Sequence, residues 1–124
     1  MSNESQDVHG VPVQKDLDLI TCVLQRGKAD KLVKAAMNAG ASGATISFAR
    51  GMGLRERLGL LGFAIVPEKE VITIVCEKKS TQRIFAAIVK AGKLDLPGMG
   101  IAYVQPISMA VGLVEAGAAQ SENK

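Results

Sequence analysis

The sequence predicts an α+β protein with a ferredoxin-like split βαββαβ fold, in which an antiparallel sheet carries two helices on one face. The first observation is the order of elements, which is strand, helix, strand, strand, helix, strand. The second is that the two halves, VLQRGKADKLVKAAMNAG and VCEKKSTQRIFAAIVKAGK, repeat one pattern of strand end, charged turn, amphipathic helix and Ala-Gly. The third is size: 124 residues with 48% hydrophobic content suit one domain.

We expect that domain at residues 16–113. Residues 1–15 are polar and carry little periodicity, so they are expected to form a flexible lead. Residues 114–124, EAGAAQSENK with the preceding Val, show no pattern that forms a core and are expected to form a flexible tail.

The first half begins with a strand at 17–24, LDLITCVL, which is apolar on both faces as in a central strand. A helix is predicted at 29–39, because its apolar residues follow helical spacing. Gly40 suits the left-handed residue that ends a helix. A second strand is expected at 44–49. The apolar stripe of the helix consists of Ala29, Leu32, Val33, Ala36 and Met37.

The second half repeats this order from a strand at 70–77, EVITIVCE. Ser80 is predicted to be the N-cap of the next helix, which ends before Gly92. A fourth strand is expected at 101–104, where Pro106 breaks it or marks it as an edge. A short fifth strand is expected at 107–113. The apolar stripe of this second helix consists of Ile84, Phe85, Ile88 and Val89.

Each central strand places Val, Leu or Ile on both of its sides. Two helices cover only one face of the sheet, so the other face is left apolar and bare. Self-association is the simplest way for so small a chain to cover it.

The segment 50–70, RGMGLRERLGLLGFAIVPEKE, connects the two halves. Gly51 and Gly53 permit positive φ and leave amide groups free to surround a phosphate or carboxylate. Arg50, Arg55 and Arg57 add positive charge. The alternative is an ordinary hairpin with a glycine bulge and solvated arginines, and residues 60–66 are compatible with a returning strand.

Composition excludes several classes of function. The net charge of +3 suits small anions but does not require nucleic acid, and the predicted first and third strands carry no aromatic residues for base stacking. The sequence offers no nucleophile–base pair or paired carboxylates, so we do not expect an enzyme.

Cys22 and Cys76 are predicted to be buried, reduced thiols, and His9 is the one histidine, so no metal site is expected. No apolar run reaches the length of a membrane span and no signal peptide is evident, so a cytoplasmic protein without membrane insertion is expected.

Three segments resemble the PII family of signal-transduction proteins. The first, LDLITCVLQRGKADKLVKAAMNAGASGATISFARGMG, is similar to the opening strand, helix and strand of that family. The second, ITIVCEKKSTQRIFAAIVKAGKL, is similar to its third strand and second helix. The third, PGMGIAYVQPI, is similar to its glycine loop and following strand.

The resemblance implies a homotrimer that holds an adenine nucleotide in clefts between subunits and regulates a partner protein, such as a membrane transporter or a metabolic enzyme, through the loop 50–70. It implies that two glycine segments and a lysine face the phosphates, which is chemically sound. The nucleotide-binding residues that it implies are Ala44, Thr45, Gly51, Met52, Gly53, Val75, Gly92, Lys93, Gly98, Met99 and Gly100. The partner-binding residues that it implies are Leu54, Arg55 and Arg57.

The sequence departs from the family pattern in ways that bear on the ligand. Leu54 and Arg55 stand where the family usually has Arg-Gln, and the loop is short and lacks the tyrosine that some members modify. Gly100 stands where a lysine usually follows the second glycine loop, and ISMAVGL brings no arginine to a triphosphate. ADP, AMP or cyclic AMP is therefore a better expectation than ATP with 2-oxoglutarate.

An alternative within the same fold is a sensor that binds no nucleotide. It would be an amino-acid binder of the ACT kind or a CutA-like trimer. The scarcity of His and of paired Cys weakens the metal-linked version, and the sequence leaves an amino-acid ligand open.

Overall fold

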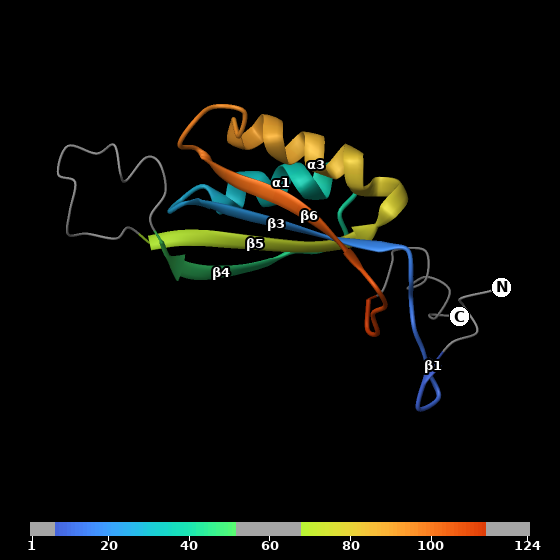
Figure 1. Cartoon of the computed structure of the whole chain (residues 1–124). Coiled ribbons are helices and arrows are strands. Elements are labelled where there is room, and N and C mark those ends of the chain that lie inside the picture. The colour runs from blue at the N-terminus through green and yellow to red at the C-terminus, as the bar shows by residue number, and fades with distance from the viewer. Residues whose placement is uncertain (1–6, 52–67, 114–124) are drawn as a thin grey trace.

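The computed structural model describes residues 7–51 and 68–113 (Figure 1). A short N-terminal hairpin, β1 (Asp7–Val8) and β2 (Val11–Pro12), precedes the main body. The main body follows in the order β3 (Leu17–Gln25), α1 (Ala29–Asn38), β4 (Thr45–Arg50), β5 (Glu68–Glu77), α3 (Lys78–Gly92) and β6 (Gly100–Ile107).

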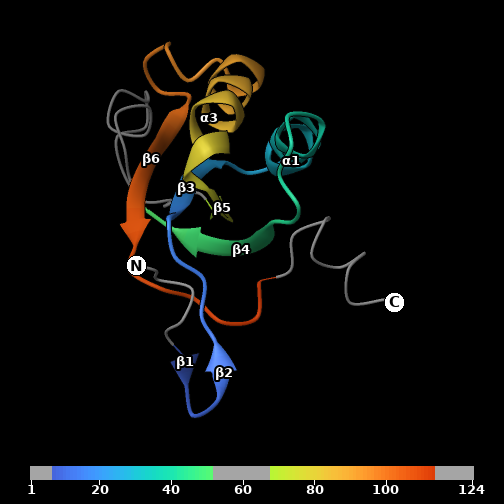
Figure 2. The ribbon, with the colours of Figure 1, turned by 90° about the vertical axis from the view of Figure 1, so that its right-hand side faces the viewer.

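The four long strands form one antiparallel sheet in the order β4-β5-β3-β6. In both views α1 and α3 lie on the same face of this sheet (Figures 1 and 2). This confirms the predicted α+β, ferredoxin-like architecture. The central pair is β3 with β5, in continuous register from Leu17 opposite Glu77 to Gln25 opposite Lys69.

The core lies between the helices and the sheet. Alternate residues of β3 and β5 point into it, as period-two alternation requires. Both cysteine side chains are buried among them, as predicted, and neither is in a disulfide; burial raises the pKa of the Cys22 thiol to about 11. The largest fully buried side chains in this layer are Ile20, Leu24, Leu32, Ile72, Ile74, Ile84 and Ile88.

Several sequence expectations differ from the structure. Ser80 is not the N-cap of α3, because the helix begins at Lys78 and its N-cap, Glu77, makes no side-chain capping bond. Met37, which helical spacing assigns to the apolar stripe of α1, is 43% exposed. Strand β6 continues through Pro106 to Ile107 instead of ending at 104, and it is an edge strand, as one of the two interpretations of Pro106 predicted.

The two chain ends of the domain also differ from expectation. The part of the lead that the structure describes contains the β1–β2 hairpin, and Val13 after it is buried. The fifth strand expected at 107–113 is reduced to one bridge, in which Gln14 and Ala110 exchange backbone hydrogen bonds of 2.8 and 3.0 Å. The expected returning strand at 60–66 lies outside the described residues.

Helix α1 receives a partner at each end from another element. The Glu70 carboxylate of β5 accepts a 2.8 Å hydrogen bond from the Ala29 N–H, at the positive end of the helix dipole. Arg83 of α3 donates through Nε to the Ala39 carbonyl at 2.6 Å, at the negative end. These two contacts orient α1 against the sheet and against α3.

Asp18 joins the start of β3 to the start of α3. Its two carboxylate oxygens accept 2.7 Å bonds from the Lys78 ammonium and the Thr81 hydroxyl. These hydrogen bonds, first from Lys78 and then from Thr81, lower the pKa of Asp18 below its ordinary value, and burial opposes them. The carboxylate therefore stays charged and links the start of β3 to the start of α3 through two hydrogen bonds.

Gly100 lies close to the backbone of β3. Its φ is +139°, and a Cβ at this position would lie 2.6 Å from the carbonyl oxygen of Val23. No L-residue side chain fits there without moving the β3–β6 pair. Gly100 thus has a structural reason to be glycine, independent of any ligand.

We predict that Thr81→Val lowers the free energy of unfolding by about 1–3 kcal/mol, because it removes a donor from a buried carboxylate. Ser80→Ala should leave stability nearly unchanged, since Ser80 does not cap α3. Urea unfolding followed by circular dichroism at one fixed chain concentration measures both. Equal losses of unfolding free energy in the two variants would contradict the stabilising role of the Thr81–Asp18 hydrogen bond.

We also predict a pH dependence. Because the pKa of Asp18 is lower in the folded than in the unfolded chain, its stabilisation is present above the unfolded pKa, about 3.9, and is lost as the pH falls through the folded value. The stability difference between the wild type and Asp18→Asn should therefore shrink below about pH 4. The exposed Asp30→Asn variant serves as control, and a pH-independent difference for Asp18→Asn would refute the role.

Gly100→Ala should destabilise the fold by more than the strain of positive φ alone, about 1–2 kcal/mol. Gly27→Ala is the matched control, because Gly27 has φ +90° but a Cβ added there would meet nothing within 4 Å. The comparison of their unfolding midpoints isolates the clash with Val23. A smaller loss for Gly100→Ala than for Gly27→Ala would show that the approach of the two strands is loose.

Candidate functional site

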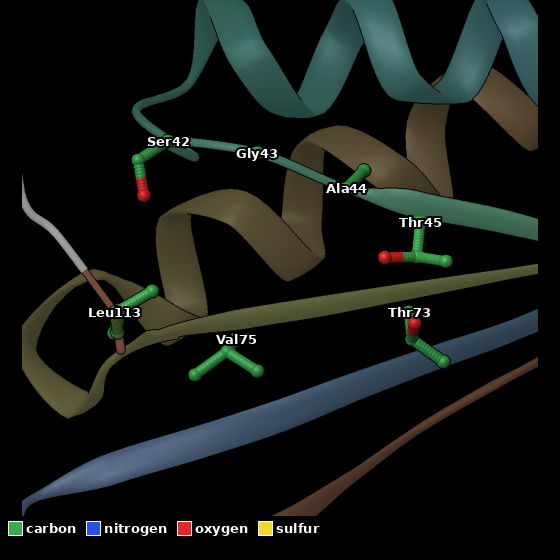
Figure 3. Close-up of a pocket in the computed structure, with 7 residues that line it drawn as sticks. All are labelled: Ser42, Gly43, Ala44, Thr45, Thr73, Val75 and Leu113. Carbon is green, nitrogen blue, oxygen red and sulfur yellow. The ribbon is translucent and has the colours of Figure 1, made fainter. Parts of the chain in front are cut away.

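A hollow of about 280 Å³ lies where the chain passes from α1 into β4 (Figure 3). The loop residues before β4 form one side of it, and β5 forms the floor. Its lining consists of Ser42, Gly43, Ala44, Thr45, Thr73, Val75 and Leu113.

The strand register explains why these residues meet. Thr45 lies directly opposite Thr73 in the β4–β5 pair, so their side chains share a face of the sheet. Val75 lies two residues further along β5 and returns to the same face. This is the face away from the helices, which neither α1 nor α3 covers.

The lining combines hydroxyl groups with apolar surface. Ser42, Thr45 and Thr73 supply donors and acceptors, while Val75 and Leu113 supply flat apolar contact. Such a mixture suits a heteroaromatic ring that needs hydrogen bonds at its edge and apolar contact on its face. The hollow is open on one side, and its volume is just below the usual range of about 300–1,000 Å³.

Three of the residues implied by the resemblance, Ala44, Thr45 and Val75, come together in this hollow. Sequence reasoning missed Ser42, Gly43, Thr73 and Leu113. The alternation of β5 could have identified Thr73, which shares a face with Val75. No sequence signal pointed to Leu113, which follows the last strand.

The first glycine segment begins at Gly51, directly after β4. Arg50, the last residue of β4, lies opposite Glu68, the first residue of β5, in the strand register. The Glu68 carboxylate forms a salt bridge with Arg26, with an N–O distance of 3.3 Å. The base of the 50–70 loop is thus lined by charges. Outside the described residues lie Met52, Gly53, Leu54, Arg55 and Arg57.

The second segment follows α3 and enters β6. Lys93 has a left-handed φ of +53°, and Gly98 has φ +82°. Gly92 lies where α1 and α3 pack closely, since a Cβ there would lie 3.1 Å from Leu32 Cδ2. The Lys93 side chain is exposed, and Met99 is half-buried.

The two glycine segments lie at the same end of the sheet but beside opposite edges. Gly51 follows edge strand β4, and Gly100 begins edge strand β6, with β5 and β3 between them. Three inter-strand spacings amount to about 14 Å. Gly51 and Gly100 of one chain are therefore too far apart to contact the same phosphate group.

A second hollow, of about 540 Å³, lies beside α3 and β6 on the helix-covered side. Asp18, Lys78, Phe85 and Val104 help to line it. It is larger, but both oxygens of its buried carboxylate are already bound by Lys78 and Thr81. The smaller hollow beside β4 is therefore the candidate site that we consider further.

Within residues 7–51 and 68–113, no three His, Cys, Asp or Glu side chains lie close enough to hold a metal ion. In the same two stretches, neither α1 nor α3 is long and apolar enough to cross a membrane.

Comparison with known proteins agrees with this fold. The family model for nitrogen regulatory protein P-II matches residues 17–115. Among solved structures, Arabidopsis thaliana PII bound to citrate matches with a TM-score of 0.60 and 19% identity, covering 77% of this chain and 80% of that chain. At this identity the match shows the fold. No curated protein matches significantly.

The family match runs from the first residue of β3 past the last described residue, Leu113, and so includes the whole sheet, both helices and the hollow beside β4. The chain belongs to the P-II family of nitrogen regulatory proteins.

Proposed function

We propose that the protein is a PII-like signalling protein that assembles as a homotrimer and binds an adenine nucleotide in the clefts between its subunits. Members of the P-II family are signalling regulators rather than enzymes. The nucleotide would be ADP, AMP, cyclic AMP or ATP. The loop 50–70 would contact the regulated protein, a transporter or a metabolic enzyme of the cytoplasm.

The observation that carries this proposal is the hollow lined by Ala44, Thr45 and Val75. Adenine has a flat apolar face and a polar edge. Val75 and Leu113 offer the apolar contact, and the hydroxyl groups of Thr45 and Thr73 offer hydrogen bonds to the edge. The site is shallow in one chain, so a neighbouring subunit would supply the missing wall.

The separation of the glycine segments supports the same arrangement. In a ring of subunits, the β6 edge of one copy can approach the β4 edge of the next. Gly98, Gly100 and Lys93 of one subunit would then meet Gly51 of its neighbour. Backbone N–H groups and one ammonium group would face the phosphates together.

The bare face of the sheet supports self-association. The strand register puts Leu19, Val23 and Val71 on the side away from the helices, together with Ile101 and Tyr103 of β6. Ile101 is 56% exposed and Tyr103 is 42% exposed. An apolar sheet face of this kind is typically covered in an assembly.

We predict that an adenine nucleotide binds the wild type, with ADP, AMP or cyclic AMP preferred to ATP, and that Thr45→Phe weakens binding at least about tenfold, or 1.4 kcal/mol. The phenyl ring would fill the base pocket. Titration calorimetry with the four nucleotides, with and without 2-oxoglutarate, bicarbonate or citrate, measures this.

Thr45→Ser is the control for this prediction. It keeps a hydroxyl group at the same place in the hollow and adds no bulk, so affinity should stay close to that of the wild type. Unchanged affinity in Thr45→Phe would remove this hollow as the nucleotide site. A trimer that binds none of the nucleotides would instead favour the alternative, a sensor such as an ACT-like amino-acid binder or a CutA-like trimer.

A further inference from the structure

We propose that the β1–β2 hairpin is an assembly arm that packs against the bare sheet face of a second copy of this chain. The arm is defined as residues 7–12. This inference rests on the proposed homotrimer and adds a contact surface to it.

The arm leaves the domain on the side of the bare face. In both views it extends from the start of β3 away from the helices and stands apart from the sheet (Figures 1 and 2). Its direction is fixed at the root, where Val13 is 5% exposed and Gln14 exchanges two backbone hydrogen bonds with Ala110. The root is therefore anchored while the tip projects outward.

The tip is a turn that the backbone has preformed. His9 and Gly10 both have positive φ, +52° and +82°, as a two-residue hairpin turn requires. Val8 and Val11 lie opposite each other, and each is 43% exposed. A hairpin of two short strands is marginally stable in water, so burial of its valines is needed to hold it.

Apolar residues also lie between the bare face and the root of the arm. Ile107 ends β6 on that face, opposite Leu17 of β3. Met109 and Val111 follow, 47% and 52% exposed, on either side of the bridge to the arm. Exposed apolar side chains thus lie both on β6 and beside the bridge at the root of the arm, and a second copy that covers the sheet face would approach the arm as well.

A second copy is the occupant that these observations favour. The bare face is the surface that self-association would cover, and its exposed apolar residues, Ile101 and Tyr103, are complementary to a pair of valines. Several arms, one from each subunit, would then link the copies of a ring.

The test uses the full chain with His9→Cys, labelled with a benzophenone maleimide. Cys22 and Cys76 are buried, so the new thiol is the reactive one among the described residues. A mixture of natural-abundance and nitrogen-15 chains is photolysed, and the cross-linked peptides are identified by mass spectrometry. Lys31→Cys, on the exposed side of α1, is the matched control.

We expect heavy–light cross-links from position 9 to β6 or to residues 107–111, and none from position 31. Cross-links confined to one chain, in an assembly shown to be a trimer, would overturn the arm and leave the proposed function standing. A monomer would overturn both. Cross-links from both positions alike would also overturn the arm.

A second measurement does not depend on labelling. Val8→Ser with Val11→Ser should raise the dissociation constant of the assembly about tenfold, because each arm loses apolar burial. Met37→Ser is the control, since Met37 is equally exposed, at 43%, but lies on the helical side. An unchanged dissociation constant in the double variant would contradict the proposal.

Discussion

The pairing of β3 with its two neighbours is the constraint on which the rest of the structure depends. Strand β3 binds β5 on one side and β6 on the other over nearly its whole length. Its helix-facing residues form the floor of the core, and Asp18 at its start ties down α3. Because β5 and β3 are the two central strands, β4 and β6 are the two edges, and each edge strand adjoins one of the glycine segments.

The positions of the two edge strands explain why the proposed site would lie between subunits. If the two glycine segments bind phosphate as proposed, their places beside opposite edges of the sheet favour a ligand shared between two chains of a ring over one held by a single chain. The same ring would cover the bare face of the sheet. Ligand binding and assembly would then depend on the same interfaces, so a nucleotide would stabilise the assembly and the assembly would complete the site.

The fold was predictable because its periodic patterns are long and local. The expected strands at 17–24 and 70–77 lie within one or two residues of β3 and β5. Contacts between distant residues were not predictable: Glu70 caps α1 across 41 positions, and Asp18 meets Thr81 across 63. Ser80 failed as a cap because Lys78 had already begun the helix. For the site, the resemblance pointed to Ala44, Thr45 and Val75, whereas Thr73 and Leu113 required the register.

Native mass spectrometry of the full chain, alone and with ADP, measures whether the nucleotide site forms between subunits, because it counts subunits and ligands in one spectrum. We expect a species with three copies of the 13.0 kDa chain that takes up as many as three nucleotides. A monomer that binds ADP by itself would contradict this expectation, since the site would then be complete within one chain.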